Sequence, residues 1–137
     1  MCDCTRRAAL GMITAASLAP PGANATAVPE REVFLAAAFR LKDAAVRAGD
    51  QPYGAVVVRN REVVGFGPSR VRELGEAAGH AERVAIADAQ RSLGREQLVD
   101  CAMYSTSRPC APCQRAAAQA KLSRMYYEHD AADAEKP

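Results

Sequence analysis

The chain has 137 residues, enough for one compact domain and little more. Hydrophobic residues make up 49% and charged residues 25%, as in ordinary globular proteins, and no stretch has the roughly 20 apolar residues that a membrane-spanning helix needs. Because 18 Lys and Arg stand against 16 Asp and Glu, the formal net charge of +2 gives no support to a nucleic-acid partner.

The first 25 residues have the composition of an export signal. The arginine pair Arg6-Arg7 precedes an uncharged run over residues 8–19, and Ala23 and Ala25 are small residues at the positions that a signal peptidase inspects. Because the pair resembles a twin-arginine signal, we expect residues 1–25 to be cleaved and the mature protein to be periplasmic or secreted. The alternative is a cytoplasmic protein whose alanine-rich leader contains Arg-Arg by chance. Residues 26–137 are predicted to form a single domain.

Residues 30–67 predict a helix followed by two strands. Apolar residues at helical spacing occupy one face of residues 30–48, and Pro52 follows the end of this helix. Residues 54–59 and 62–67 have the composition of strands, and a turn at Asn60 and Arg61 would join them into an antiparallel hairpin. Residues 55–58 are all apolar, as in a strand that is covered on both faces. We therefore expect helices above and below the sheet.

The second half of the chain contains two more helices and two more strands. Mixed charge and two glycines make residues 68–79 a connection, and helical spacing resumes over residues 80–91. Residues 99–107 predict a third strand, residues 110–122 a helix, residues 124–127 a fourth strand and residues 130–137 a polar tail. Tyr53 and Phe66 are interpreted as core residues, with base stacking as the alternative role.

Four residues in two short motifs are of the types that bind and use a catalytic zinc ion. His80 and Glu82 form an H-x-E motif, and Cys110 and Cys113 form a P-C-x-x-C motif. One imidazole and two thiolates hold zinc with one position open for water, whereas structural sites use four protein ligands. The other histidine, His129, stands in the tail, so no fourth protein ligand is expected.

Each motif alone also occurs in proteins that have no catalytic zinc. An H-x-E motif arises by chance on helix surfaces, and C-x-x-C also forms redox pairs and halves of zinc knuckles. The remaining cysteines are Cys2 and Cys4 in the leader and Cys101 in a predicted strand, a distribution unlike a disulfide framework. Both motifs open predicted helices, whose N-termini favour thiolate at Cys110 and Cys113. Taken together, the motifs favour a zinc site.

Glu82 is interpreted as a proton shuttle rather than a zinc ligand. Zinc lowers the pKa of a bound water toward roughly 7. The two motifs together resemble the signature of zinc-dependent nucleobase deaminases, whose reaction takes a proton from water, delivers one to a ring nitrogen and gives one to the departing ammonia. A single carboxylate beside the metal can carry out all three transfers.

Three stretches resemble the cytidine and deoxycytidylate deaminase superfamily, and within it the branch that contains guanine deaminases and tRNA adenosine deaminases. They are residues 52–58 (PYGAVVV), 79–82 (GHAE) and 104–113 (YSTSRPCAPC). The resemblance implies an α/β fold, a three-layer αβα sandwich with a central mixed sheet. It implies zinc held by His80, Cys110 and Cys113, proton transfer by Glu82 and a substrate contact by the Ala81 backbone amide. It also implies an oligomer, usually a homodimer whose neighbouring subunit borders the site.

The sequence departs from the family pattern at three places. Ser69 stands where relatives carry a base-recognising Asn, so the resemblance implies a substrate contact at this position, but a serine cannot present the same paired amide donor and acceptor. Arg108 replaces the Glu that many relatives have before the Pro-Cys of the second motif. The chain ends soon after the fourth strand, so the domain is expected to be C-terminally shortened relative to the family.

We therefore expect zinc-dependent hydrolytic deamination of a small nucleobase or nucleoside, guanine- or cytosine-type, with a purine such as guanine ranked first. Adenosine deamination in tRNA is the alternative enzyme activity, ranked lower because the net charge is small and an exported protein would not meet tRNA. A deaminase-like zinc-binding protein without turnover is a second alternative, which the three departures support. A Cys110–Cys113 redox protein is the third.

Overall fold

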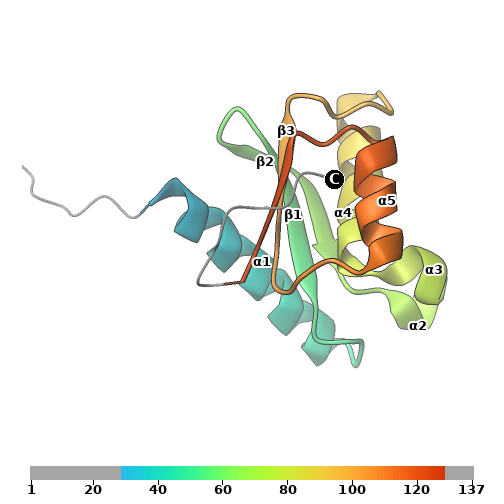
Figure 1. Cartoon of the computed structure of the whole chain (residues 1–137). Coiled ribbons are helices and arrows are strands. Elements are labelled where there is room, and N and C mark those ends of the chain that lie inside the picture. The colour runs from blue at the N-terminus through green and yellow to red at the C-terminus, as the bar shows by residue number, and fades with distance from the viewer. Residues whose placement is uncertain (1–28, 129–137) are drawn as a thin grey trace, which may run out of the picture.

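The computed structural model describes residues 29–128 (Figure 1). The predicted leader at residues 1–25, His129 and the tail that follows it, where the shortened end was expected, lie outside this described part. Among residues 29–128, no helix is both long and apolar enough to cross a membrane. The elements in chain order are α1 (Glu30–Arg47), β1 (Gly54–Arg59), β2 (Glu62–Pro68), α2 (Val71–Leu74), α3 (Glu76–Gly79), α4 (Ala81–Leu93), β3 (Cys101–Ser105), α5 (Ala111–Gln119) and β4 (Arg124–Tyr127).

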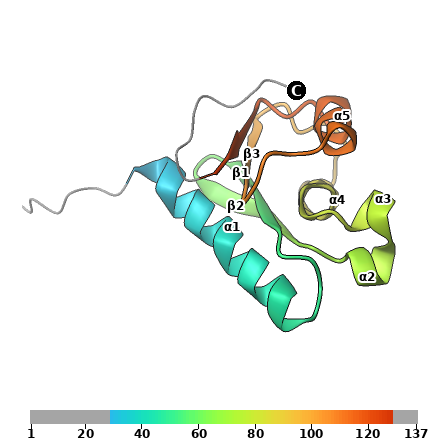
Figure 2. The same ribbon diagram turned by 60° about the horizontal axis from the view of Figure 1, so that its bottom comes forward.

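The four strands form one mixed sheet in the order β2-β1-β3-β4. β1 pairs antiparallel with both β2 and β3, whereas β3 and β4 are parallel. Helix α1 covers one face of the sheet, and α4 and α5 lie together on the other (Figures 1 and 2). The structure therefore confirms the predicted three-layer αβα sandwich with a central mixed sheet.

Each face of the sheet has its own hydrophobic core, and β1 contributes to both. Ala55 and Val57 pack into the core under α4 and α5, while Val56 and Val58 pack into the core under α1. Successive side chains of a strand point to opposite faces, so a strand between two helix layers must be apolar at every position. The prediction that residues 55–58 are covered on both faces is confirmed.

The predicted hairpin between the first two strands is also confirmed. Asn60 and Arg61 have φ angles of 49° and 64°, and Arg59 pairs with Glu62 across the turn. Positive φ at both central residues is what a two-residue turn needs to match the twist of its strands.

The connection predicted at residues 68–79 instead contains two short helices, α2 and α3. The carboxylate of Asp50, in the α1–β1 loop, accepts hydrogen bonds from the backbone amides of Val71 and Arg72, at 3.1 and 3.0 Å. Amides in a first helical turn have no partner within the helix, so Asp50 satisfies two of them from outside. Gly75, with φ of 82°, separates α2 from α3. No local sequence pattern predicts α2 and α3, because the Asp50 carboxylate that caps α2 lies some 20 residues earlier in the chain.

Two elements are shorter than predicted. β3 covers Cys101–Ser105 rather than residues 99–107, because the Asp100 carboxylate pairs with Arg59 and Arg95 and holds the turn that precedes the strand. α5 ends at Gln119 rather than at residue 122, because Lys121 has φ of 58° and turns the chain out of the helix.

Two glycines in β2 allow α4 to lie unusually close to the sheet. A Cβ atom at Gly67 would overlap the carbonyl oxygen of Ala81 and lie 2.7 Å from the Cβ of Ala85. A Cβ at Gly65 would lie 2.7 Å from the Cβ of Ala89. Because Ala81 begins α4, Gly67 determines how closely the start of this helix approaches the sheet.

We predict that Gly67→Ala destabilises the fold by about 1–3 kcal/mol, because the added methyl group overpacks the contact with the α4 backbone. Gly94→Ala is the matched control: Gly94 has φ of 63° and no atom within 4 Å of a built Cβ, so this variant carries only a backbone cost of about 1 kcal/mol. Urea unfolding measures both free energies. A Gly67→Ala loss no larger than that of Gly94→Ala would contradict this account of the helix contact.

Candidate metal centre and its pocket

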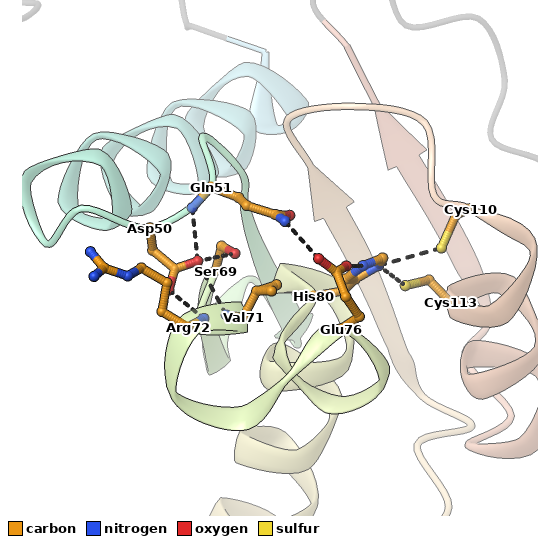
Figure 3. A network of polar contacts seen from close by, with 9 residues as sticks. All are labelled: Asp50, Gln51, Ser69, Val71, Arg72, Glu76, His80, Cys110 and Cys113. Atoms are coloured by element: carbon orange, nitrogen blue, oxygen red, sulfur yellow. Dashed lines mark hydrogen bonds and ion pairs between the residues drawn. The ribbon is translucent and has the colours of Figure 1, made fainter.

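The three predicted zinc ligands lie at the starts of two neighbouring helices. His80 is the residue that precedes α4, Cys110 precedes α5, and Cys113 lies in the first turn of α5. Both capping residues have extended backbone angles, with ψ of 139° for His80 and 164° for Cys110. The change from extended chain to helix directs both side chains toward the space between the two helix ends (Figure 3).

The distances between the ligand atoms fit a zinc ion. His80 Nδ1 lies 3.5 Å from Cys110 Sγ and 3.4 Å from Cys113 Sγ. All three ligand atoms are within 4.8 Å of one another. Zn–N bonds of about 2.0 Å and Zn–S bonds of about 2.3 Å at tetrahedral angles place nitrogen and sulfur about 3.5 Å apart. The spacing and the donor types therefore match a zinc site with three protein ligands.

The two thiols have different electrostatic surroundings. Burial raises the pKa of the Cys113 thiol, and the negative charge of Glu82 adds to this effect. For Cys110 burial acts in the same direction, but hydrogen bonds from Cys113 and His80 outweigh it and lower the pKa. The prediction that helix N-termini favour thiolate at both positions agrees with the pKa shift of Cys110 but not with that of Cys113. Zinc binding must displace a proton from Cys113, since the thiolate is the ligand form.

Glu82 is a buried carboxylate next to the ligand cluster. Its exposed fraction is 6%, and burial raises its pKa above the ordinary value for a glutamate. The positive charge of His80 and a hydrogen bond with the Cys113 thiol act in the opposite direction without cancelling the effect of burial. A carboxyl group with a raised pKa takes up and releases protons more readily near neutral pH than an ordinary glutamate.

A pocket of about 460 Å³ opens onto Glu82 and two of the three proposed ligands, His80 and Cys110. This volume lies within the range that binds small organic molecules. The residues that line it are Gln51, Tyr53, His80, Ala81, Glu82, Ser107, Arg108, Cys110 and Glu128. The metal cluster and the proposed proton shuttle therefore face the same small-molecule space.

Tyr53 and Phe66 are not core residues, contrary to the sequence prediction. Their exposed fractions are 42% and 51%, and Tyr53 lines the pocket. Phe66 lies on β2, which has β1 as its only sheet neighbour in the described chain, so its side chain can face solvent. Aromatic character by itself therefore does not predict burial for a residue in an edge strand or just before a strand.

The two predicted substrate contacts occupy different places. Ala81 lies at the start of α4 and lines the pocket, where its backbone amide is at the helix N-terminus. Ser69 is 3% exposed, donates a hydrogen bond to Asp50 Oδ1 at 2.8 Å, and is not among the residues that line this pocket. Substrate contacts by Ala81 and Ser69 stay predictions, and the Ser69 hydroxyl already has a partner in the protein.

Two residues that the sequence analysis did not select contact the site. Glu76 Oε2 lies 3.1 Å from His80 Nε2, and Gln51 Nε2 donates to Glu76 Oε1 at 3.1 Å (Figure 3). The spacing of four residues between Glu76 and His80 is a signal for contact on a helix, but residues 68–79 were predicted to be irregular. Gln51 has no local signal, since it comes from the α1–β1 loop.

Comparison with known proteins agrees with this geometry. Residues 29–129 match the family model for the cytidine and deoxycytidylate deaminase zinc-binding region. The chain belongs to this deaminase family. The resemblance inferred from the motifs is thereby confirmed, and zinc is the metal that the family model and the His80, Cys110 and Cys113 cluster both indicate.

The relatives include two kinds of deaminase. Guanine deaminase from Bacillus subtilis strain 168 is 37% identical over 107 residues, covering 75% of this chain and 69% of that protein. A tRNA-specific adenosine deaminase from Aquifex aeolicus strain VF5 is 32% identical over 97 residues, covering 71% of this chain. The chain spans 64% of the length of the Aquifex protein, just under two thirds.

Solved structures of the same two kinds share the fold. The Bacillus subtilis guanine deaminase superposes with a TM-score of 0.67 at 35% identity, covering 72% of this chain and 65% of that one. A structure from a study of A-to-I editing by tRNA:A34 deaminases at the wobble position of transfer RNA gives a TM-score of 0.68 at 35% identity. It covers 72% of this chain and 75% of the other.

We predict that the purified protein, reconstituted with zinc, holds about one zinc ion per chain. His80→Ala and Cys113→Ala should lose most of it, because each removes one of three ligands. Cys101→Ala is the control: Cys101 is a buried cysteine of β3 outside the ligand cluster, so its loss should leave zinc content unchanged. Inductively coupled plasma mass spectrometry measures the metal. Full zinc content in both ligand variants would contradict the assigned site.

Proposed function

We propose that this protein catalyses zinc-dependent hydrolytic deamination of a small nucleobase or nucleoside, with a purine such as guanine as the first candidate. The observation that carries the proposal is a pocket of about 460 Å³ lined by the buried Glu82 and by His80 and Cys110, two of the three residues of the His-Cys-Cys cluster. A metal cluster alone would serve binding. A buried carboxylate beside it adds the proton transfer that hydrolysis of a C–N bond requires.

A bound zinc ion supplies one part of this chemistry, the activation of water as a nucleophile at neutral pH. Glu82 takes a proton from the attacking water as its oxygen adds to the ring carbon that carries the amino group, and passes this proton to the adjacent ring nitrogen. It then takes the proton of the added hydroxyl group and delivers it to the leaving nitrogen, so that the C–N bond breaks, a carbonyl forms and ammonia departs. The pKa of Glu82, raised by burial, suits a residue that must both accept and donate protons in one cycle.

The relatives support two substrate classes. The guanine deaminase relative supports a free purine base, and the pocket volume accommodates a single base or nucleoside. The tRNA-specific adenosine deaminase relatives support a base flipped out of a nucleic acid, which would use the same kind of pocket. The small net charge favours the small-molecule substrate, because nucleic-acid binding rests on phosphate neutralisation by Lys and Arg.

Three other hypotheses from the sequence analysis bear on this proposal. The deaminase-like protein without turnover is the alternative if the pocket binds a base but releases no ammonia. A homodimer whose neighbouring subunit borders the site remains an expectation from the family resemblance. The redox alternative is disfavoured because zinc bound by Cys110 and Cys113 leaves no free dithiol.

A substrate screen tests the proposed activity. Zinc-loaded protein is incubated with guanine, cytosine, cytidine, adenosine and a tRNA anticodon stem-loop, and released ammonia is measured. We expect guanine to give the highest rate of ammonia release among these substrates. Release from the stem-loop alone would support the tRNA alternative, and release from no substrate, with zinc fully bound, would contradict the proposed enzyme activity.

We predict that Glu82→Gln folds and binds zinc but lowers the turnover of the substrate found in the screen by about 100-fold or more, because the amide cannot transfer protons. Glu62→Gln, an exposed residue at the start of β2, is the matched control and should retain full activity. Ammonia release and metal content are measured on the same samples. Normal turnover in zinc-loaded Glu82→Gln would exclude the assigned role.

A further inference from the structure

The two ring nitrogens of His80 face different partners. Nδ1 lies 3.5 and 3.4 Å from the sulfur atoms of Cys110 and Cys113, on the side where the metal binds. Nε2 lies 3.1 Å from a carboxylate oxygen of Glu76, on the opposite side of the ring (Figure 3). The imidazole therefore lies between the metal position and a carboxylate.

This arrangement selects one tautomer of the ring. An ionised carboxylate can only accept hydrogen bonds, so Nε2 must carry the proton that it donates to Glu76. In the neutral imidazole the other nitrogen, Nδ1, is then left with a lone pair, which is the form that binds a metal. Glu76 thus favours the tautomer that zinc requires, and the direction of the hydrogen bond also fixes the rotation of the ring.

Glu76 is itself held in place by a second contact. Its side chain is 71% exposed, so a single hydrogen bond to His80 would leave it free to turn toward water. Gln51 Nε2 donates to the other carboxylate oxygen, Oε1, at 3.1 Å. With both oxygens engaged, the carboxylate has a defined orientation toward the ring.

Gln51 in turn is fixed by the Asp50 cluster. The Gln51 backbone amide donates to Asp50 Oδ1 at 2.8 Å, and the Ser69 hydroxyl and the Val71 amide donate to the same oxygen. These contacts tie the α1–β1 loop to the end of β2 and the start of α2. The loop that carries Gln51 is therefore held against α2, the helix that directly precedes the helix of Glu76.

We propose that Glu76 is a positioning residue for the metal centre: it orients His80 so that Nδ1 faces zinc. Gln51 holds the Glu76 carboxylate in the orientation that contacts His80 Nε2. Neither residue touches the metal or the reacting atoms in this role. The inference rests on the same zinc site as the proposed function. Zinc affinity is measured without turnover, however, so a protein that binds zinc tightly but releases no ammonia would refute the proposed function alone.

The first test measures zinc affinity by competition with a chelator of known affinity. Loss of a residue that orients a ligand histidine weakens metal binding by about 10- to 100-fold. Because Glu76 is exposed and water can replace its carboxylate, we expect Glu76→Ala to weaken zinc binding by about 10-fold. Glu76→Gln can still accept a hydrogen bond and should weaken zinc binding less. Glu73→Ala removes a carboxylate of α2 that pairs with Arg70 outside the site and should leave the affinity unchanged. Circular dichroism checks that each variant is folded.

The second test observes the proposed hydrogen bond directly. The chain contains only two histidines, so the imidazole signals of ¹⁵N-labelled zinc-bound protein can be assigned to His80 and His129. We expect a slowly exchanging Nε2 proton on His80 in the unchanged protein and in Glu73→Ala, and fast exchange of this proton in Glu76→Ala. A role of Glu76 confined to the stability of α3 would not alter this proton in folded, zinc-bound protein.

The third test concerns Gln51. We expect Gln51→Ala to weaken zinc binding less than Glu76→Ala does, and to have no further effect when Glu76 is already alanine, because residues that act through one another are not additive. Additive effects would overturn the role of Gln51. Zinc affinity within twofold of the unchanged protein, together with an unaltered Nε2 proton in Glu76→Ala, would overturn the role of Glu76. If Glu76→Ala does not fold, the same two measurements on Glu76→Leu, which keeps a long side chain but cannot accept a hydrogen bond, decide the question.

Discussion

The close packing of α4 against the sheet, beside α5, is the constraint on which the rest of this structure depends. Three ligands separated by some 30 residues in sequence meet because both helices lie on the same sheet face and begin at the same end of it (Figure 1). Gly65 and Gly67 of β2 make this possible by leaving no side chain between the strand and the helix backbone. A larger residue at either position would move the helix that carries His80 and Glu82.

The same packing sets the chemistry of the site through burial. Glu82 and Cys113 are both shielded from water, and burial disfavours the charged form of each. A bound divalent cation reverses this preference, because its charge stabilises a thiolate and a carboxylate nearby. Metal binding and protonation at this site are therefore linked, and the free energy of zinc binding contributes to the stability of the folded domain.

The polar contacts outside the ligand cluster connect segments that are remote in sequence. Asp50 accepts hydrogen bonds from the backbone of α2 and from Ser69, and thereby fixes the loop that precedes β1. Gln51 extends this contact to Glu76, and Glu76 to His80. The helices α2 and α3 are each only four residues long, so they depend on these contacts rather than on their own propensity.

The sequence by itself determined the elements with a local signal. The apolar run at residues 55–58 indicated a strand covered on both faces, and Asn60-Arg61 indicated the hairpin turn. The two motifs indicated the candidate zinc ligands. Residue type and short spacing decide all three features. Only the tertiary structure decided the surroundings of the site. The helices at residues 71–79, the exposure of Tyr53 and the contacts of Glu76 and Gln51 depend on which segments meet, and the packing of helices on a sheet brings together residues that are far apart in the chain.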